Sequence, residues 1–146
     1  MQTVIIQNDY PVLAERLWAL ATDYGALDRV ARPVLRFDGL PRGEIEAGHV
    51  LTPRRSVFGI MPWRPCRLEV LERDDARMIL RSDQTGAGPG CWRHTLAVTP
   101  TAEGSRMTDL IEVEAGFLTP LAALWVHYLF AARHGPRAEL LERGEF

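Results

Sequence analysis

The stretch CWRHTLAVTPTAEGSRMTDLIEV, residues 91–113, decides the fold class, because it reads as two strands joined by a short turn. In the first strand alternate residues form one apolar face, and His94 interrupts this face. The second strand alternates in the same way and is interrupted by Asp109. The pattern predicts an antiparallel hairpin with one oily face, on which each strand places one ionisable residue.

The register of this hairpin decides whether the two ionisable residues meet. The two oily faces coincide only when paired positions sum to an odd number. A sum of 203 does this and gives three pairs: Trp92 with Ile111, His94 with Asp109, and Leu96 with Met107. We therefore expect His94 and Asp109 to be cross-strand neighbours within reach of a hydrogen bond. Two interpretations stay open: a satisfied polar couple inside the protein, and a functional pair in which Asp109 orients His94.

Outward from the hairpin, the chain predicts more strands and two helical regions. Short alternating or β-branched runs, separated by turn residues, predict strands near 34–38, 49–57, 63–73, 77–85, 91–99 and 106–115. A strand at 3–6 precedes a helix that we expect to be capped at Asn8-Asp9, with Pro11 in its first turn and Gly25 at its end. A second short helix is expected over 26–31.

A last helix is expected near 119–143, with Leu121, Trp125, Tyr128, Leu129 and Ala132 on one stripe. The order of these elements predicts a single α+β domain, residues 1–146. In this domain a curved antiparallel sheet of about seven strands wraps around the long C-terminal helix, and two short helices follow the first strand.

With these elements the chain resembles the SRPBCC superfamily, whose helix-grip fold is shared by START-like lipid-transfer domains, pollen-allergen proteins and polyketide cyclase/dehydrase-like proteins. The segments that carry the resemblance are YPVLAERLWALATDYGAL (10–27), WRHTLAVTPTAEGSRMTDLIEV (92–113) and RHGPRAELL (133–141). The resemblance implies a cavity between sheet and helix that holds an apolar small molecule of aromatic, polyketide-like or lipid-like character. That superfamily has no common catalytic motif, so no catalytic residue is carried over.

The expected ligand-binding residues lie on the sheet, on the last helix and on a rim. They are Trp92, His94, Leu96, Met107, Asp109, Ile111, Trp125, Tyr128, Leu129, Phe58, Met61 and Trp63. The rim residues belong to FGIMPW, 58–63, a turn that is apolar where a solvated turn would be polar. This turn lies at the same end of the predicted sheet as GAGPG (86–90) and GFLT (116–119), and together the three connections predict the mouth of a ligand site with a lid. The alternative is that the tip of the turn is tucked into the protein's own core.

Composition limits the classes of function. Hydrophobic residues make up 47% of the 146 residues and charged residues 25%, which is typical of a globular domain. The net charge of −2 argues against a nucleic-acid partner. Residues 1–10 lack the pattern of a signal peptide, so we expect a cytoplasmic protein. Cys66 and Cys91 lack metal spacing and are expected to be free buried thiols, and neither a metal nor a cofactor is expected.

Three functions are compatible with these observations. The leading hypothesis is binding of a hydrophobic small molecule. The first alternative is a cyclase/dehydratase-type enzyme in which His94, held by Asp109, moves a proton. The second is an interaction or homodimerising module that uses an apolar helix face of Ala123, Val126 and Phe130.

Two further questions concern arginines. Four arginines flank the apolar turn: Arg54, Arg55, Arg64 and Arg67. They would suit contact with a membrane surface or an anionic ligand, although surface arginines usually serve solubility. Arg81 would point inward if it shares the inner face with Ile79, but the neighbouring stripe of Met78 and Leu80 is an equally good inner face.

Overall fold

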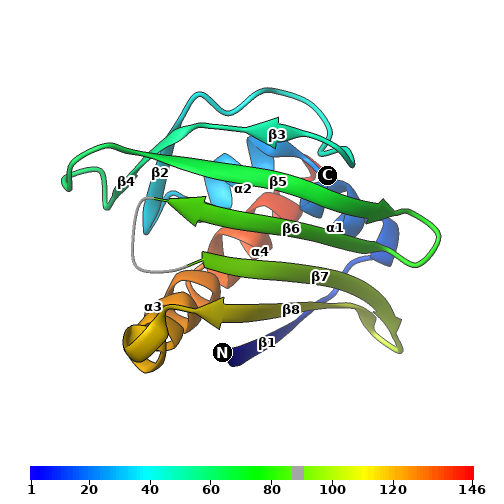
Figure 1. Ribbon diagram of the computed structural model, residues 1–146. Coiled ribbons are helices and arrows are strands. Elements are labelled where there is room, and N and C mark those ends of the chain that lie inside the picture. Colours follow the sequence, from blue (N-terminus) through cyan, green and yellow to red (C-terminus); the bar gives the residue numbers. More distant parts are fainter. Residues whose placement is uncertain (87–90) are drawn as a thin grey trace.

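An antiparallel sheet of eight strands forms one layer of this computed structural model, which describes residues 1–86 and 91–146 (Figure 1). The strands are β1 (Gln2–Tyr10), β2 (Leu35–Asp38), β3 (Val50–Leu51), β4 (Arg54–Val57), β5 (Arg64–Asp74), β6 (Ile79–Gly86), β7 (Cys91–Thr101) and β8 (Gly104–Glu114). The helices are α1 (Ala14–Ala21), α2 (Tyr24–Ala31), α3 (Thr119–Ala131) and α4 (His134–Glu142). The strand order is β1-β8-β7-β6-β5-β4-β2, and β3 pairs with β5.

The helices all lie on one side of the sheet, and α3 and α4 together cross its strands (Figure 1). A bulge in the β5–β6 register, between Val70 and Glu72, adds to the curvature of the sheet around them. The chain therefore has the helix-grip fold that the sequence predicts. No helix within residues 1–86 and 91–146 has both the length and the apolar character that crossing a membrane requires.

Two clusters of buried apolar side chains fill the space between sheet and helices. One cluster joins α1, α2 and the end of α4 to the middle of the sheet, and the other packs α3 on β1 and β8. In β8, for example, Met107 belongs to the first cluster and Ile111 to the second. Between them in sequence stands Asp109, which is also buried. On β8, a buried acid thus stands between the two apolar clusters.

The region after β1 differs from the prediction. Asn8 and Asp9 do not cap a helix, because β1 continues to Tyr10 and pairs with β8 along its whole length. Helix α1 begins at Ala14 without a side-chain cap. Gly25 is not the end of this helix; Asp23 Oδ1 accepts a hydrogen bond from the Ala26 amide at 2.9 Å and so caps a new helix, α2, which contains Gly25.

Two predicted elements are each divided. The strand expected at 49–57 is two short strands, β3 and β4, because Pro53 between them has no amide to donate to a ladder. The C-terminal helix is interrupted at Ala132 and Arg133, where Gly135 and Pro136 follow. The break separates α3 from α4.

The hairpin of β7 and β8 has a register two residues away from the predicted one. His94 pairs with Ile111, Leu96 with Asp109, and Trp92 with Val113, so paired positions sum to 205. Both sums are odd, so both place the same residues on the inner face. The strand faces of β5 and β6 are also settled: Leu80, Ser82 and Gln84 point inward and Arg81 is exposed. Cys66 is buried as expected, whereas Cys91 is exposed at the start of β7.

Candidate functional site

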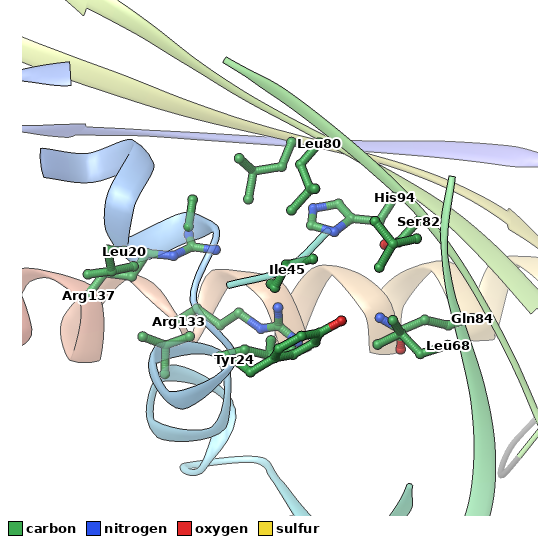
Figure 2. Close-up of a pocket in the computed structure, with 15 residues that line it drawn as sticks. Leu20, Tyr24, Ile45, Leu68, Leu80, Ser82, Gln84, His94, Arg133 and Arg137 are labelled. Carbon is green, nitrogen blue, oxygen red and sulfur yellow. The ribbon is translucent and has the colours of Figure 1, made fainter. Parts of the chain in front are cut away.

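A cavity lies between the inner face of the sheet and helices α2 and α4 (Figure 2). Its volume is about 50 Å³, which is room for a few water molecules. Ten of its lining residues are aliphatic or aromatic: Leu20, Ala21, Tyr24, Leu27, Val30, Ile45, Leu68, Val70, Leu80 and Leu96. The other five are polar: Ser82, Gln84, His94, Arg133 and Arg137. The lining of the cavity is therefore mainly apolar, and its polar residues include two arginines.

The two arginines reach the cavity because of their spacing at the start of α4. Arg133 directly precedes α4 and its carbonyl accepts a hydrogen bond from the Arg137 amide at 3.1 Å, so the two residues are one helical turn apart and lie on one face. That face is otherwise apolar, since Phe130 precedes the arginines and Leu140 follows them, and all four residues are buried. The exposed fractions of Arg133 and Arg137 are only 4% and 2%. In Figure 2 both side chains extend from the helix into the space beneath the sheet.

His94 and Asp109 are in contact, as the sequence predicts. His94 Nε2 lies 2.6 Å from Asp109 Oδ1. Because of the observed register, the two side chains meet diagonally across the strands instead of directly opposite each other. Phe130 packs on the imidazole with a distance of 4.7 Å between ring centroids.

Asp109 is bound on its second oxygen as well. Arg137 Nη1 donates to Asp109 Oδ2 at 3.3 Å. Burial alone would raise the pKa of Asp109, but the charge of Arg137 and the hydrogen bond from His94 outweigh it and hold this pKa well below its usual range. Asp109 is therefore ionised at neutral pH and can only accept, so His94 donates from Nε2. The Nδ1 atom of His94 is left for other partners.

Arg133 has no such partner. Among the described residues its buried Nε has no hydrogen-bond acceptor, and the ion pairs of this part of the chain give Asp109 to Arg137. The guanidinium lies over the ring of Phe130, with its Cζ 4.2 Å from the centroid. Burial, together with repulsion from Arg137, lowers the pKa of Arg133 to about 9, so the group is charged at neutral pH but poorly stabilised.

Most of the buried charged side chains are arginines. Among the described residues, the buried side chains with a formal charge at neutral pH are one acid, Asp109, and three arginines, Arg55, Arg133 and Arg137. Arg55 lies over the ring of Trp92, 5.1 Å from its centroid, and donates to the Gly86 carbonyl at 3.4 Å. Burial lowers the pKa of Arg55 as well.

The structure brings few of the predicted binding residues to this cavity. His94 and Leu96 line it, and Asp109 lies directly behind His94. Four others are buried in the packed core and do not line it: Trp92, Met107, Ile111 and Leu129. Trp92, Ile111 and Leu129 enclose no space because α3 packs closely on β1 and β8 through small side chains such as Ala122 and Ala123. Met107 belongs to the other apolar cluster, where it is fully buried.

Two predictions for residues of α3 are wrong. Tyr128 does not reach into a cavity; it is 50% exposed, because the inward stripe of α3 passes through Val126 and Leu129 instead, and Trp125 is partly buried beside it. The face proposed for a protein partner, Ala123, Val126 and Phe130, is buried in the second apolar cluster and so is not available to one.

The rim residues lie at the surface. Phe58, Met61 and Trp63 are exposed in the β4–β5 connection, so this tip is not tucked into the core. The Phe58 backbone has a φ of 56°, a strained value for a non-glycine residue, and the Ser56 hydroxyl holds the turn by donating to the Met61 carbonyl at 2.6 Å. None of the three lines the cavity. Of the expected mouth, residues 87–90 lie outside the described residues.

The arginine pair was missed from the sequence although it left a signal there. Phe130, Arg133, Arg137, Leu140 and Leu141 follow helical spacing and form one stripe. Two arginines within such a stripe indicate a buried polar site. By contrast, no group of three His, Cys, Asp or Glu side chains in the described part of the chain is arranged to hold a metal ion.

Comparison with solved structures supports the fold. Protein CV1439 from Chromobacterium violaceum matches with a TM-score of 0.77 at 15% identity, covering 96% of each chain. TTHA0849 from Thermus thermophilus has a TM-score of 0.75 at 18% identity, covering 99% of this chain and 100% of its own. Ara h 8.0201 has a TM-score of 0.65 at 12% identity, covering 94% and 98%. At these identities the likeness concerns the fold. No family model matches the chain, and no curated protein sequence matches it either.

Proposed function

We propose that this protein binds an apolar small molecule of aromatic, polyketide-like or lipid-like character in the cavity between the sheet and helices α2 and α4. The observation that carries the proposal is the lining of the cavity, which consists of ten aliphatic or aromatic side chains and five polar ones. Small-molecule sites typically combine apolar walls with a few polar groups that fix orientation. The helix-grip fold supports the same function, as the resemblance to the SRPBCC superfamily implies.

The small volume of the cavity means that binding requires an opening movement. Ligand sites usually enclose about 300–1,000 Å³, whereas this cavity has about 50 Å³. The wall opposite the sheet includes Tyr24 and Leu27 from α2 and Ile45 from the segment before β3. Hydrogen bonds tie this segment to the helices, among them the Ile45 amide to the Thr22 carbonyl at 2.7 Å and the Tyr24 hydroxyl with His49 Nδ1 at 2.9 Å, and others tie it to β5, such as Arg73 Nη1 to the Ile45 carbonyl at 3.0 Å. Outward movement of this wall enlarges the cavity without separating the sheet.

A displacement test with an apolar dye addresses this function. Leu96→Trp places an indole in the cavity, so binding of an environment-sensitive dye should fall at least tenfold. Ile5→Trp is the matched control, because Ile5 is exposed on the outer face of β1, while its neighbours Val4 and Ile6 are buried on the inner face. Equal dye binding by Leu96→Trp and the wild type would contradict the proposal.

Proton transfer by His94 is a second candidate function. It is favoured by the 2.6 Å contact with Asp109, which fixes the imidazole while His94 lines the cavity. In a cyclase/dehydratase-type reaction, neutral His94 would take a proton from the ligand through Nδ1, and Asp109 would stabilise the resulting imidazolium. His94→Gln should then abolish turnover of a polyketide substrate while leaving its binding within about threefold of the wild type; unchanged turnover would remove this candidate.

A further inference from the structure

The buried arginine Arg133 indicates what kind of apolar molecule the cavity accepts. A guanidinium in a protein interior is normally paired, since an isolated buried charge is costly. Arg137 follows this rule through its 3.3 Å contact with Asp109. Arg133 does not, because its Nε has no acceptor among the described residues. The side chain is 4% exposed, so bulk water does not compensate for the missing partner.

The contact with Phe130 does not satisfy Arg133. A cation lying over an aromatic ring is attracted by the face of the ring, which leaves the N–H groups at the edge of the guanidinium plane free. These N–H groups form a planar fork that matches the two oxygens of a carboxylate. Arg133 is also one of the residues that line the cavity.

The surroundings of Arg133 favour an anion over a neutral polar group. At the cavity the buried formal charges of the described residues are two positive, Arg133 and Arg137, and one negative, and this one acid, Asp109, is already shared by Arg137 and His94. A neutral ligand leaves this excess of positive charge in place. An anionic ligand reduces it in a region with little water, where electrostatic attraction is strong.

We infer that the ligand is an amphipathic organic acid whose carboxylate binds Arg133 and whose apolar part occupies the oily portion of the cavity. This inference rests on the proposed function and narrows it to one class of ligand. The acid group lies at Arg133, beneath the sheet and at the start of α4; the hydroxyl of Ser82 and the amide of Gln84 line the same cavity. The apolar part extends toward Leu20, Leu80 and Leu96.

Calorimetric titration with matched acids and amides tests the inference. The probes are 2-naphthoate with 2-naphthamide, and decanoate with decanamide, each pair sharing one apolar part. At pH 7 the wild type should bind the acid of at least one pair ten- to a hundredfold more tightly than its amide, as expected for a charge-assisted hydrogen bond in a dry site. Arg133→Met should lose this preference but keep the affinity for the amide, and Arg133→Lys should retain part of the preference.

Arg143→Met is the matched control, because Arg143 follows α4 but is exposed and pairs with Glu139. It should behave like the wild type. Equal affinity of the wild type for acid and amide would overturn the inference and leave the proposed function standing. Failure of every probe to bind would overturn the proposed function together with the inference. An acid preference that survives in Arg133→Met would assign the anion to another group and so overturn the role of Arg133.

Discussion

Replacing Arg133 by methionine should stabilise the ligand-free protein, although it removes a large buried side chain. Burial and the charge of Arg137 lower the pKa of the guanidinium to about 9, and at about 1.4 kcal/mol for each pH unit this lowering corresponds to a penalty of several kcal/mol at neutral pH. The substitution also gives up the contact with Phe130, which is worth about 2 kcal/mol in a desolvated position. The expected net gain is therefore about 1–3 kcal/mol, or several degrees in Tm.

The same substitution at Arg137 should have the opposite effect. Arg137 is paired with Asp109, so Arg137→Met leaves a buried carboxylate with one partner fewer and should cost about 3–5 kcal/mol. Urea unfolding at pH 7 measures both variants, after refolding from denaturant to remove any bound molecule. A loss of stability in Arg133→Met comparable to that in Arg137→Met would refute the reasoning, because it would mean that the protein already satisfies the guanidinium of Arg133.

The remaining predictions concern Asp109, the cavity, the hairpin and the rim. The pKa of Asp109 is lower in the folded than in the unfolded protein, so its stabilisation is complete above about pH 5 and fades as the pH falls further. Asp109→Asn should thus cost about 3 kcal/mol in urea unfolding at pH 7 and less at pH 3, and an equal loss at both would contradict this. Leu96→Trp should cost about 1–3 kcal/mol in urea unfolding, the usual range for overpacking, and a larger loss would show an interior without usable space. Gly104→Ala should cost roughly 2 kcal/mol or more, because its Cβ would lie 2.2 Å from the Tyr10 carbonyl oxygen; a neutral result in thermal unfolding would disprove this close approach. If Phe58, Met61 and Trp63 form a lid, their amide hydrogen exchange should slow when 2-naphthoate is bound, and unchanged exchange would leave them an exposed turn without that role.

The strand faces were predictable from the sequence because side chains alternate strictly along a strand. Alternation placed His94 and Asp109 on the inner face, and the predicted sum of 203 placed them directly opposite each other. At the observed sum of 205 they still meet, but diagonally. Alternation could not fix the register, since sums of 203 and 205 place the same residues inside. The observed sum follows from a tight turn in which only Ala102 and Glu103 separate β7 from β8.

The position of the cavity was not predictable in this way, because it depends on how closely each helix approaches the sheet. The small side chains Ala122 and Ala123 let α3 pack against β1 and β8, so Ile111 and Leu129 enclose no space. The remaining space lies further along, where Leu27 and Ile45 form the opposite wall. Nothing in the spacing of those two residues relates them to β7 and β8.

Binding inside the cavity is tested most directly by NMR of methyl groups during titration with 2-naphthoate and, in parallel, decanoate. At least one acid should shift the methyl signals of Leu20, Ile45, Leu80 and Leu96, which line the cavity, and the shifts should saturate at one molecule for each protein chain. The signals of Leu121 and Leu124, which are exposed on α3, should stay in place. Shifts confined to exposed residues, or no shifts at millimolar concentrations of either acid, would contradict the account.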